Sequence, residues 1–254
     1  MSKNQREKEI LEILKIKHYA TVEYLAEKLF ISPSSIRRDL SSLEDKGYVR
    51  RSYGGAELVS QPTFMAPFSI RKQENRREKM AIVRNAASLI LPDSSIFIDS
   101  SATALHFASV LNAEQNITVY TNNMQLAYLL ASRHVKVYAA GGLVSDYNHV
   151  VTTGSYTCRM LEGIYVDQMF FTSTALGENG QIMDVSEEET AVRSFMLERA
   201  QERIFLCSKE RFGKLSHHVV TSLDSVEYVV SDEKLPDSFI EKYKSIRFIS
   251  SKVK

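Results

Sequence analysis

Apolar residues recur at helical spacing in three short segments at the start of the chain. In the first segment, four aliphatic residues between Ile10 and Leu14 stand among Lys, Glu and Arg, which predicts an amphipathic helix over 5–17. The second helix follows Thr21, a residue suited to capping a helix N-terminus, and is predicted to end near Leu29. Three short amphipathic helices of this kind need one another to bury their apolar faces.

The third helix has the clearest boundaries. Ser32 is a preferred N-cap, and Pro33 fits the first helical position because its missing N–H is not needed there. The helix is predicted to run over 33–46, with Gly47 as the residue that ends it. Its apolar residues are spaced to face the core, and they are Ile36, Leu40 and Leu43. Residues 48–56 follow with a Gly-Gly pair, which predicts a β-hairpin, or wing.

Short polar residues and arginines gather at the N-terminal end of the third helix, where they can reach base edges and phosphates. Arg50 and Arg51 stand where a wing would meet the DNA backbone, and the glycine pair permits close approach. The alternative is a generic packing module with solvated arginines. The predicted DNA contacts are Thr21, Ser32, Ser34, Ser35, Arg37, Arg38, Arg50, Arg51, Gly54 and Gly55.

Helices and strands alternate from Met80 onward, which predicts an α/β domain with a mainly parallel sheet. The expected helices are 80–91, 103–111, 124–132, 156–163 and 188–202. The expected strands are 96–98, 117–121, 135–140, 168–173, 203–207 and 228–231. We therefore divide the chain into a DNA-binding domain over 1–58, a proline-containing linker over 59–76 and a sensing domain over 77–254. The basic stretch 71–79 is interpreted as a solvated helix start.

Composition indicates the general class of protein but not its function. The 254 residues are 44% hydrophobic and 25% charged, which is typical of a globular protein with a true core. No apolar run approaches the ~20 residues that span a bilayer, and residues 1–12 have no signal-peptide core. Two cysteines make no disulfide framework, so we expect a cytoplasmic setting. The formal net charge is +1, so the DNA hypothesis depends on local charge placement.

Polar loops follow several of the predicted strands. In parallel sheets, ligands bind outside the carboxyl ends of the strands. Residues 99–103 follow one strand and open a helix, whose free N–H groups would favour an anion. Simple helix capping by Ser101 or Thr103 explains the same residues equally well. Asn122, Gly141-Gly142 and residues 208–211 follow the other strands.

The segments 32–40, 43–47 and 51–56 together resemble the DeoR family of bacterial regulators. The chain keeps the I-R-R-D-L and G-G-A portions of the family pattern, with Ser35 for the usual threonine and Tyr53 for the usual histidine. The resemblance implies that the third helix enters the major groove and that the wing arginines support it. Asp39 is expected to hold Arg37 or Arg38.

Residues 99–103, 121–122, 141–142 and 208–213 resemble the DeoR sensor domain, so the likeness spans about 5–232. It implies a ribose-phosphate-isomerase-like fold whose strand ends bind a sugar phosphate. The chain departs from the family at Ser101, Ser208 and Arg211, and Arg211 can still pair with phosphate. The implied effector residues are Asp99, Ser100, Ser101, Ala102, Thr103, Thr121, Asn122, Gly141, Gly142, Glu188 and Arg211.

Other clusters point to no chemistry of their own. Residues 187–189 near Asp184 are interpreted as a charged helix start, with one member lining the effector site. His217 and His218 lack partners at metal-ligand spacing, and Cys158 and Cys207 are expected to be structural. We expect no catalytic residue, cofactor or metal.

The leading hypothesis is a repressor of a carbohydrate operon, relieved by a phosphorylated sugar. Its partners would be double-stranded operator DNA, that metabolite and further copies of the chain in a dimer or higher homo-oligomer, with no membrane. The alternatives are a sugar-phosphate isomerase or deaminase, and a DNA-binding regulator whose sensor site is degenerate.

Overall fold

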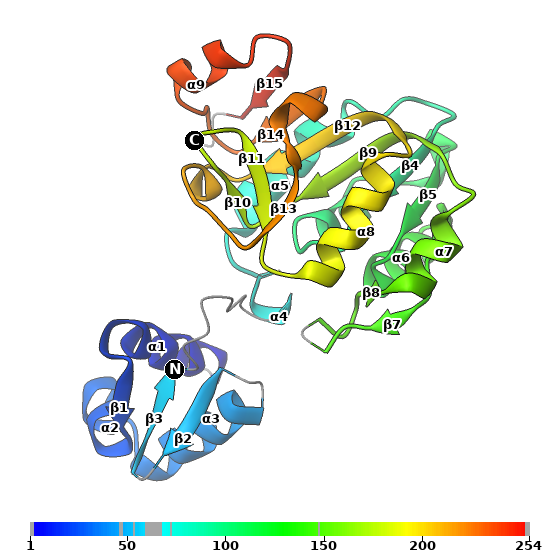
Figure 1. Cartoon of the computed structure of the whole chain (residues 1–254). Helices are drawn as coiled ribbons and strands as arrows, with labels where there is room; N and C mark the ends of the chain where they lie inside the picture. The colour runs from blue at the N-terminus through cyan, green and yellow to red at the C-terminus, as the bar shows by residue number, and fades with distance from the viewer. Residues whose placement is uncertain are drawn as a thin grey trace. The chain divides into compact units, whose positions relative to one another are not determined.

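The computed structural model describes residues 3–45, 48–52, 54–58, 68–71, 73–146 and 148–251. The chain forms two compact units, Met1–Phe64 and Met65–Lys254 (Figure 1). Gly47, Tyr53 and residues 59–67 of the expected linker lie outside the described residues. Among the described residues, no helix is long and apolar enough to cross a membrane.

The first unit is a winged helix-turn-helix, as predicted. Helices α1 (Lys3–Lys17), α2 (Val22–Leu29) and α3 (Pro33–Asp45) pack with an antiparallel sheet of order β1-β3-β2. The wing is formed by β2 (Val49–Ser52) and β3 (Gly55–Leu58). The three predicted core residues of α3 are fully buried. Strand β1 (Tyr19–Thr21) was not predicted, because three residues are too few to show an alternating pattern.

The second unit is built on a seven-stranded parallel sheet of order β15-β14-β12-β9-β4-β5-β6. The strands are β4 (Ser95–Ile98), β5 (Thr118–Thr121), β6 (Lys136–Ala139), β9 (Val166–Thr172), β12 (Ala200–Cys207), β14 (Tyr228–Ser231) and β15 (Arg247–Ser250). The chain builds outward from β4 to β6, returns beside β4 as β9, and then builds the other way. The switch in direction therefore lies between β4 and β9.

Both faces of this sheet are covered. Ile96 and Ile98 of β4 belong to one apolar cluster, and Phe97 between them belongs to another on the opposite face. The first cluster includes residues of α4 (Phe68–Arg71), α5 (Arg76–Ala87), α6 (Met124–Ala131) and the 3₁₀ helix η1 (Ala104–Ser109). The second includes residues of α7 (Ser155–Leu161), α8 (Glu187–Leu197) and α9 (Asp237–Lys242) (Figure 1). Strands buried on both faces explain the continuous apolar runs in the sequence.

Shorter elements complete the second unit. The hairpin of β7 (Leu143–Val144) and β8 (Thr152–Thr153) precedes α7, and a small sheet joins β10 (Ala175–Leu176), β11 (Gln181–Asp184) and β13 (His218–Ser222). Three more single-turn 3₁₀ helices are η2 (Ala113–Gln115), η3 (Lys209–Arg211) and η4 (Leu223–Ser225). None of these short strands was predicted, because two to five residues give too little periodicity.

Three predicted boundaries were wrong for identifiable reasons. Helix α8 ends at Leu197, because residues from Ala200 onward already pair with β9 and lengthen β12. The helix expected over 103–111 is the 3₁₀ helix η1. The helix expected from Met80 begins at Arg76. The solvated interpretation of 71–79 holds for the exposed Arg76 and Arg77 but was wrong for Lys79, which is only 7% exposed.

Candidate DNA interface and effector site

The N-terminal end of α3 presents a polar, exposed surface. Ser32 caps the helix, because its Oγ accepts the Ser35 backbone N–H at 3.3 Å. Arg38 donates to Ser35 Oγ at 3.3 Å, and Arg37 lies 3.6 Å from the Glu23 carboxylate of α2. These exposed pairs are weak and can open toward a phosphate or a base edge.

Arg50 and Arg51 of β2 are both exposed, and as neighbours in a strand they point to opposite faces of the wing. Arg51 is the better held of the two, because its backbone N–H donates to Glu44 and its guanidinium donates to Ser41 at 3.0 Å. Among the residues that the structure describes, Arg50 pairs only with Glu57, at 3.9 Å. The structure thus fixes Arg51 against α3 and leaves Arg50 the freer side chain.

Three of the predicted DNA-contact residues have a structural task of their own. Thr21 Oγ1 accepts the Tyr24 N–H at 3.1 Å and caps α2. A Cβ on Gly55 would overlap the carbonyl of Ala20, so β1 requires this glycine. Gly54 has φ +79° with open space around it, which suits the tight turn of the wing.

Asp39 does not hold Arg37 or Arg38, contrary to the sequence expectation. It is 1% exposed on the inner side of α3 and accepts from Arg6 of α1, at 2.7 Å from Nε and 3.1 Å from Nη2. This hydrogen-bonded pairing raises the pKa of Arg6. The carboxylate therefore fastens two helices together instead of orienting the recognition arginines.

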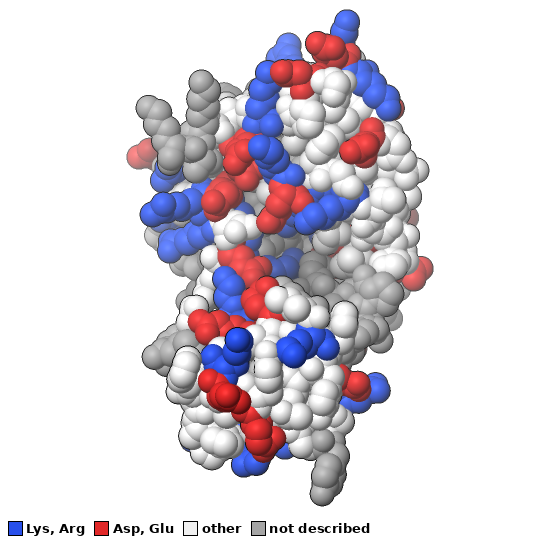
Figure 2. Space-filling model, turned by 90° about the vertical axis from the view of Figure 1, so that its left-hand side faces the viewer, with Lys and Arg blue, Asp and Glu red and all other residues white. Residues whose placement is uncertain are grey.

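Basic and acidic side chains are interspersed on the face drawn in Figure 2 and form no large patch of one sign. This distribution agrees with the formal net charge of +1. This face therefore offers no extended basic surface to DNA phosphates.

In the second unit, the loop after β4 lies at the switch point of the sheet. Asp99 is fully buried, and its carboxylate accepts the N–H of Ser101 at 3.0 Å and that of Thr172, at the end of β9, at 2.9 Å. Ser101 Oγ in turn accepts the Ala104 N–H at 3.0 Å and caps η1, whereas Thr103 makes no capping bond. Asp99 thus joins the ends of β4 and β9 at the switch point, the place where sheets of this kind bind ligands.

Arg193 of α8 is the centre of a buried ion-pair network. Its guanidinium lies 3.0 Å from each of three carboxylates, on Asp99, Asp184 and Glu189. Burial by itself lowers the pKa of Arg193, but the three carboxylates outweigh it and the net pKa is raised. Glu189 also accepts from Ser100 Oγ at 3.1 Å. The network ties α8 to the loop after β4.

Further cations border this network. Arg211 donates to the carbonyl of Ser173, just beyond β9, and Lys79 donates to the carbonyls of Arg71 and Glu74. Burial, followed by the charge of Arg211, lowers the pKa of Lys79 to about 8. Burial likewise lowers the pKa of Arg71, against the opposing charge of Glu189. Partly desolvated cations with lowered pKa values favour an anion between them.

Most of the predicted effector residues meet here, but they bind one another. Thr121 Oγ1 accepts the Asn123 N–H at 3.1 Å, and Asn122 donates its side-chain amide to Thr152 at 2.9 Å. Ser100, Ser101 and Ala102 are buried in the same loop. The predicted residue Glu188 is exposed and accepts from Ser186 Oγ at 3.1 Å, whereas its neighbour Glu189 is buried beside Ser100.

The glycine pair after β6 serves packing. A Cβ on Gly142 would overlap the Thr157 hydroxyl of α7, and its φ is +146°. Gly141 donates its N–H to the Met160 sulfur at 3.1 Å. The glycine pair therefore allows α7 to approach the chain closely just after β6.

Sequence reasoning missed Arg193 and Lys79. The one available signal was the spacing of Glu189 and Arg193, which are i and i+4 on a helix, although the same spacing occurs on solvated helices. No local pattern marks Lys79 as buried.

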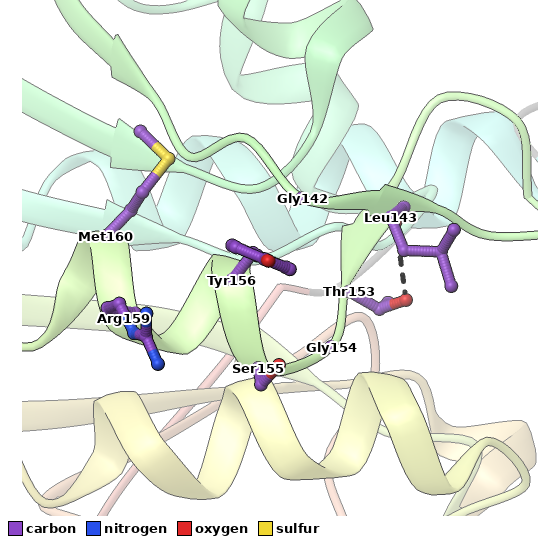
Figure 3. A pocket seen from close by; sticks show the side chains of 8 residues that line it. All are labelled: Gly142, Leu143, Thr153, Gly154, Ser155, Tyr156, Arg159 and Met160. Atoms are coloured by element: carbon purple, nitrogen blue, oxygen red, sulfur yellow. Dashed lines mark hydrogen bonds between the residues drawn. The ribbon is translucent and has the colours of Figure 1, made fainter.

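A separate open cavity of about 770 Å³ lies on the outside of the hairpin of β7 and β8. Figure 3 shows Leu143 of β7 on one side of it and Tyr156, Arg159 and Met160 of α7 on the other. Leu143 and Tyr156 are each 71% exposed. The polar residues Thr153, Ser155 and Arg159 share the lining with these apolar and aromatic side chains, and Gly142 is the predicted effector residue among them.

The two cysteines and the possible metal ligands were assessed among the described residues. Burial raises the pKa of Cys207 to about 12 and also raises that of Cys158, so neither thiol is activated. The described residues include no group of three or more His, Cys, Asp or Glu able to hold a metal ion.

Comparison with known proteins agrees with this architecture. A family model described as a DeoR-like helix-turn-helix domain matches residues 6–62, and one described as a DeoR C terminal sensor domain matches residues 74–233. The chain belongs to the DeoR family of transcriptional regulators.

Two relatives of this DeoR-family chain align over nearly its whole length. The HTH-type transcriptional repressor GlcR of Bacillus subtilis is 30% identical, over 93% of this chain and 91% of that protein. The L-fucose operon activator of Haemophilus influenzae is 28% identical, over 94% of this chain and 96% of that protein. Among solved structures, ribose 5-phosphate isomerase A from Methanocaldococcus jannaschii has a TM-score of 0.43 at 14% identity, over 56% of this chain and 57% of that chain.

Proposed function

We propose that this regulator represses a carbohydrate-use operon and that a phosphorylated sugar relieves the repression. The observation that carries the proposal is the meeting of Arg211 and Lys79 beside the switch point between β4 and β9. A switch point is where such sheets bind ligands, and partly buried cations suit a phosphate. The proposal of a carbohydrate operon is supported by the names of the relatives, since one of them is an L-fucose operon activator.

On the DNA side, α3 would enter the major groove, with Ser34, Ser35, Arg37 and Arg38 facing the bases and phosphates. Arg50 and Arg51 would contact the backbone from the wing, with Gly54 at its tip. Thr21, Ser32 and Gly55 would act indirectly, by shaping α2, α3 and the wing. We propose repression instead of activation because repression is common in this family. The experiment below tests this part of the proposal separately.

An enzyme of the isomerase or deaminase type is the less favoured alternative. Carboxylates at the switch point would be its natural acid and base. Asp99 and Glu189 are instead bound to Arg193, each at 3.0 Å, which leaves neither available to move a proton.

The regulator would act as a homo-oligomer, because helix-turn-helix proteins read two half-sites. We propose that a second copy covers the exposed apolar side chains Leu143, Tyr156 and Met160 around the outer cavity. Exposed apolar patches often mark protein–protein contacts. In a symmetric dimer, the same patch on both copies can form one contact.

The test is a fluorescence anisotropy titration of the full chain against the promoter upstream of its own gene, with a scrambled duplex as control. We expect specific, salt-sensitive binding that a sugar phosphate, such as glucose 6-phosphate, fructose 6-phosphate or ribose 5-phosphate, weakens. Equal affinity for both duplexes would contradict DNA recognition. Specific binding unaffected by any sugar phosphate would contradict the sensing role and favour a degenerate sensor. A reporter fused to the promoter decides between repression and activation.

A further inference from the structure

The turn between β7 and β8 contains a buried side chain without a hydrogen-bond partner. Asn148 is 2% exposed, and neither its Nδ2 nor its Oδ1 bonds to any described residue. A buried amide left unsatisfied costs about 1–3 kcal/mol for each lost group, so such side chains are rare without a reason.

This turn is fastened over the loops at the switch point. Val151 donates to the carbonyl of Asn148 at 2.8 Å and is bridged to Asn123, and Val150 accepts the Met124 N–H at 2.7 Å. Asn123 in turn donates its side-chain amide to the carbonyl of Ser100 at 3.3 Å. Asn148 therefore belongs to the segment that covers the ends of β4 and β5.

A second unsatisfied group lies on the other segment that contacts Ser100. Thr190 of α8 is 8% exposed, and its Oγ1 has no partner among the described residues. It follows Glu189, whose carboxylate accepts from Ser100 Oγ. Two segments that approach Ser100 from different elements thus each carry a buried polar group with unused hydrogen-bonding capacity.

We propose that the side-chain amide of Asn148, assisted by the hydroxyl of Thr190, binds the hydroxyl groups of the effector's carbon chain. Hydrogen-bonding chemistry distinguishes hydroxyl binding from phosphate binding. The Asn148 amide both donates and accepts hydrogen bonds, and so does a sugar hydroxyl, whereas a phosphate only accepts them. Arg211 and Lys79 would hold the phosphate, and Asn148 would distinguish one sugar from another. The inference rests on the proposed function.

Asn148→Leu tests the inference, because it keeps the branching and the number of side-chain heavy atoms and removes the amide. In the full-length protein without ligand, we expect the melting temperature to stay unchanged or rise, because an unsatisfied group is lost. Calorimetric affinity for whichever of glucose 6-phosphate, fructose 6-phosphate and ribose 5-phosphate binds the wild type should fall about 10- to 100-fold. Affinity for inorganic phosphate should stay within about twofold. Thr190→Val should repeat the pattern with a smaller loss.

Asn85→Leu is the matched control, since the amide of Asn85 donates to Ser251 Oγ at 2.6 Å. It should lower the melting temperature and leave both affinities unchanged. A lower melting temperature for Asn148→Leu would overturn the inference, because the amide would then be bonded in the free protein. Equal sugar-phosphate affinity in Asn148→Leu and wild type would also overturn it while the proposed function stands. If the wild type binds no sugar phosphate, both fail together.

Discussion

Arg193 donates its Nε proton to Asp99 Oδ2 at 3.0 Å, although the two residues are 94 positions apart. The bond joins the middle of α8 to the loop after β4, at the point where the strand order reverses. The same guanidinium neutralises Asp184 and Glu189, so one side chain compensates three buried carboxylates. This arginine therefore connects α8 to the loop after β4 and to two further carboxylates.

Arg193→Met should destabilise the second unit by about 3–5 kcal/mol, because three buried carboxylates lose their partner. Urea unfolding followed by circular dichroism measures the change. Lys234→Met is the matched control: Lys234 pairs with Asp237 at the surface, and we expect no measurable loss. A small effect of Arg193→Met would mean that the network does not hold α8.

Gly142→Ala should destabilise the second unit by about 1–3 kcal/mol, because its φ is +146° and its Cβ would overlap the Thr157 hydroxyl. Thermal unfolding of the purified variant checks this. Gly163→Ala provides the control, since a Cβ there meets nothing within 4 Å. Equal melting temperatures for the two variants would refute the packing role of Gly142.

Lys79 predicts a pH dependence of stability. Its pKa is about 8 in the folded chain and about 10.5 when unfolded, so the unfolded state binds the proton more tightly. Stability relative to Lys79→Met should therefore rise between pH 8 and about pH 10.5 and stay constant below pH 8. Urea titrations of both proteins across this range measure the difference. A flat difference would show that Lys79 titrates as a solvated lysine.

Arginines of the helix and of the wing should differ in their effect on DNA binding. Arg38→Ala and Arg37→Ala should each weaken operator binding, by about 1–3 kcal/mol where a base contact is lost, and relax specificity. Arg50→Ala should weaken binding to all duplexes and reduce the salt slope by about 1. Anisotropy against operator and scrambled duplexes separates these outcomes. Two silent helix arginines would exclude α3 as the recognition helix.

Leu143→Asp should disrupt the proposed contact between copies, because it places a charge in an exposed apolar patch. Light scattering should show a lower molar mass than for the wild type, with an unchanged circular dichroism spectrum. Leu215→Asp is the control, because Leu215 is also an exposed leucine (73%) but lies outside this patch. It should leave the molar mass unchanged. An unchanged mass for Leu143→Asp would place the interface elsewhere.

The sequence by itself determined the winged helix-turn-helix and the alternating α/β order. These features follow from local physics, since the spacing of Ile36, Leu40 and Leu43 and the Ser32-Pro33 cap need no distant partner. The loop at Asp99 could also be found, because the ends of parallel strands meet at one edge.

Only the tertiary structure decided how those residues are used. It paired Asp39 with Arg6 and brought Arg193 to Asp99. It also buried Lys79 and Glu189 and left Glu188 exposed. It also left Asn148 buried without a partner among the described residues. Each outcome depends on segments that are distant in the chain, and the free energy of a buried polar group is set by whichever partners the fold brings to it.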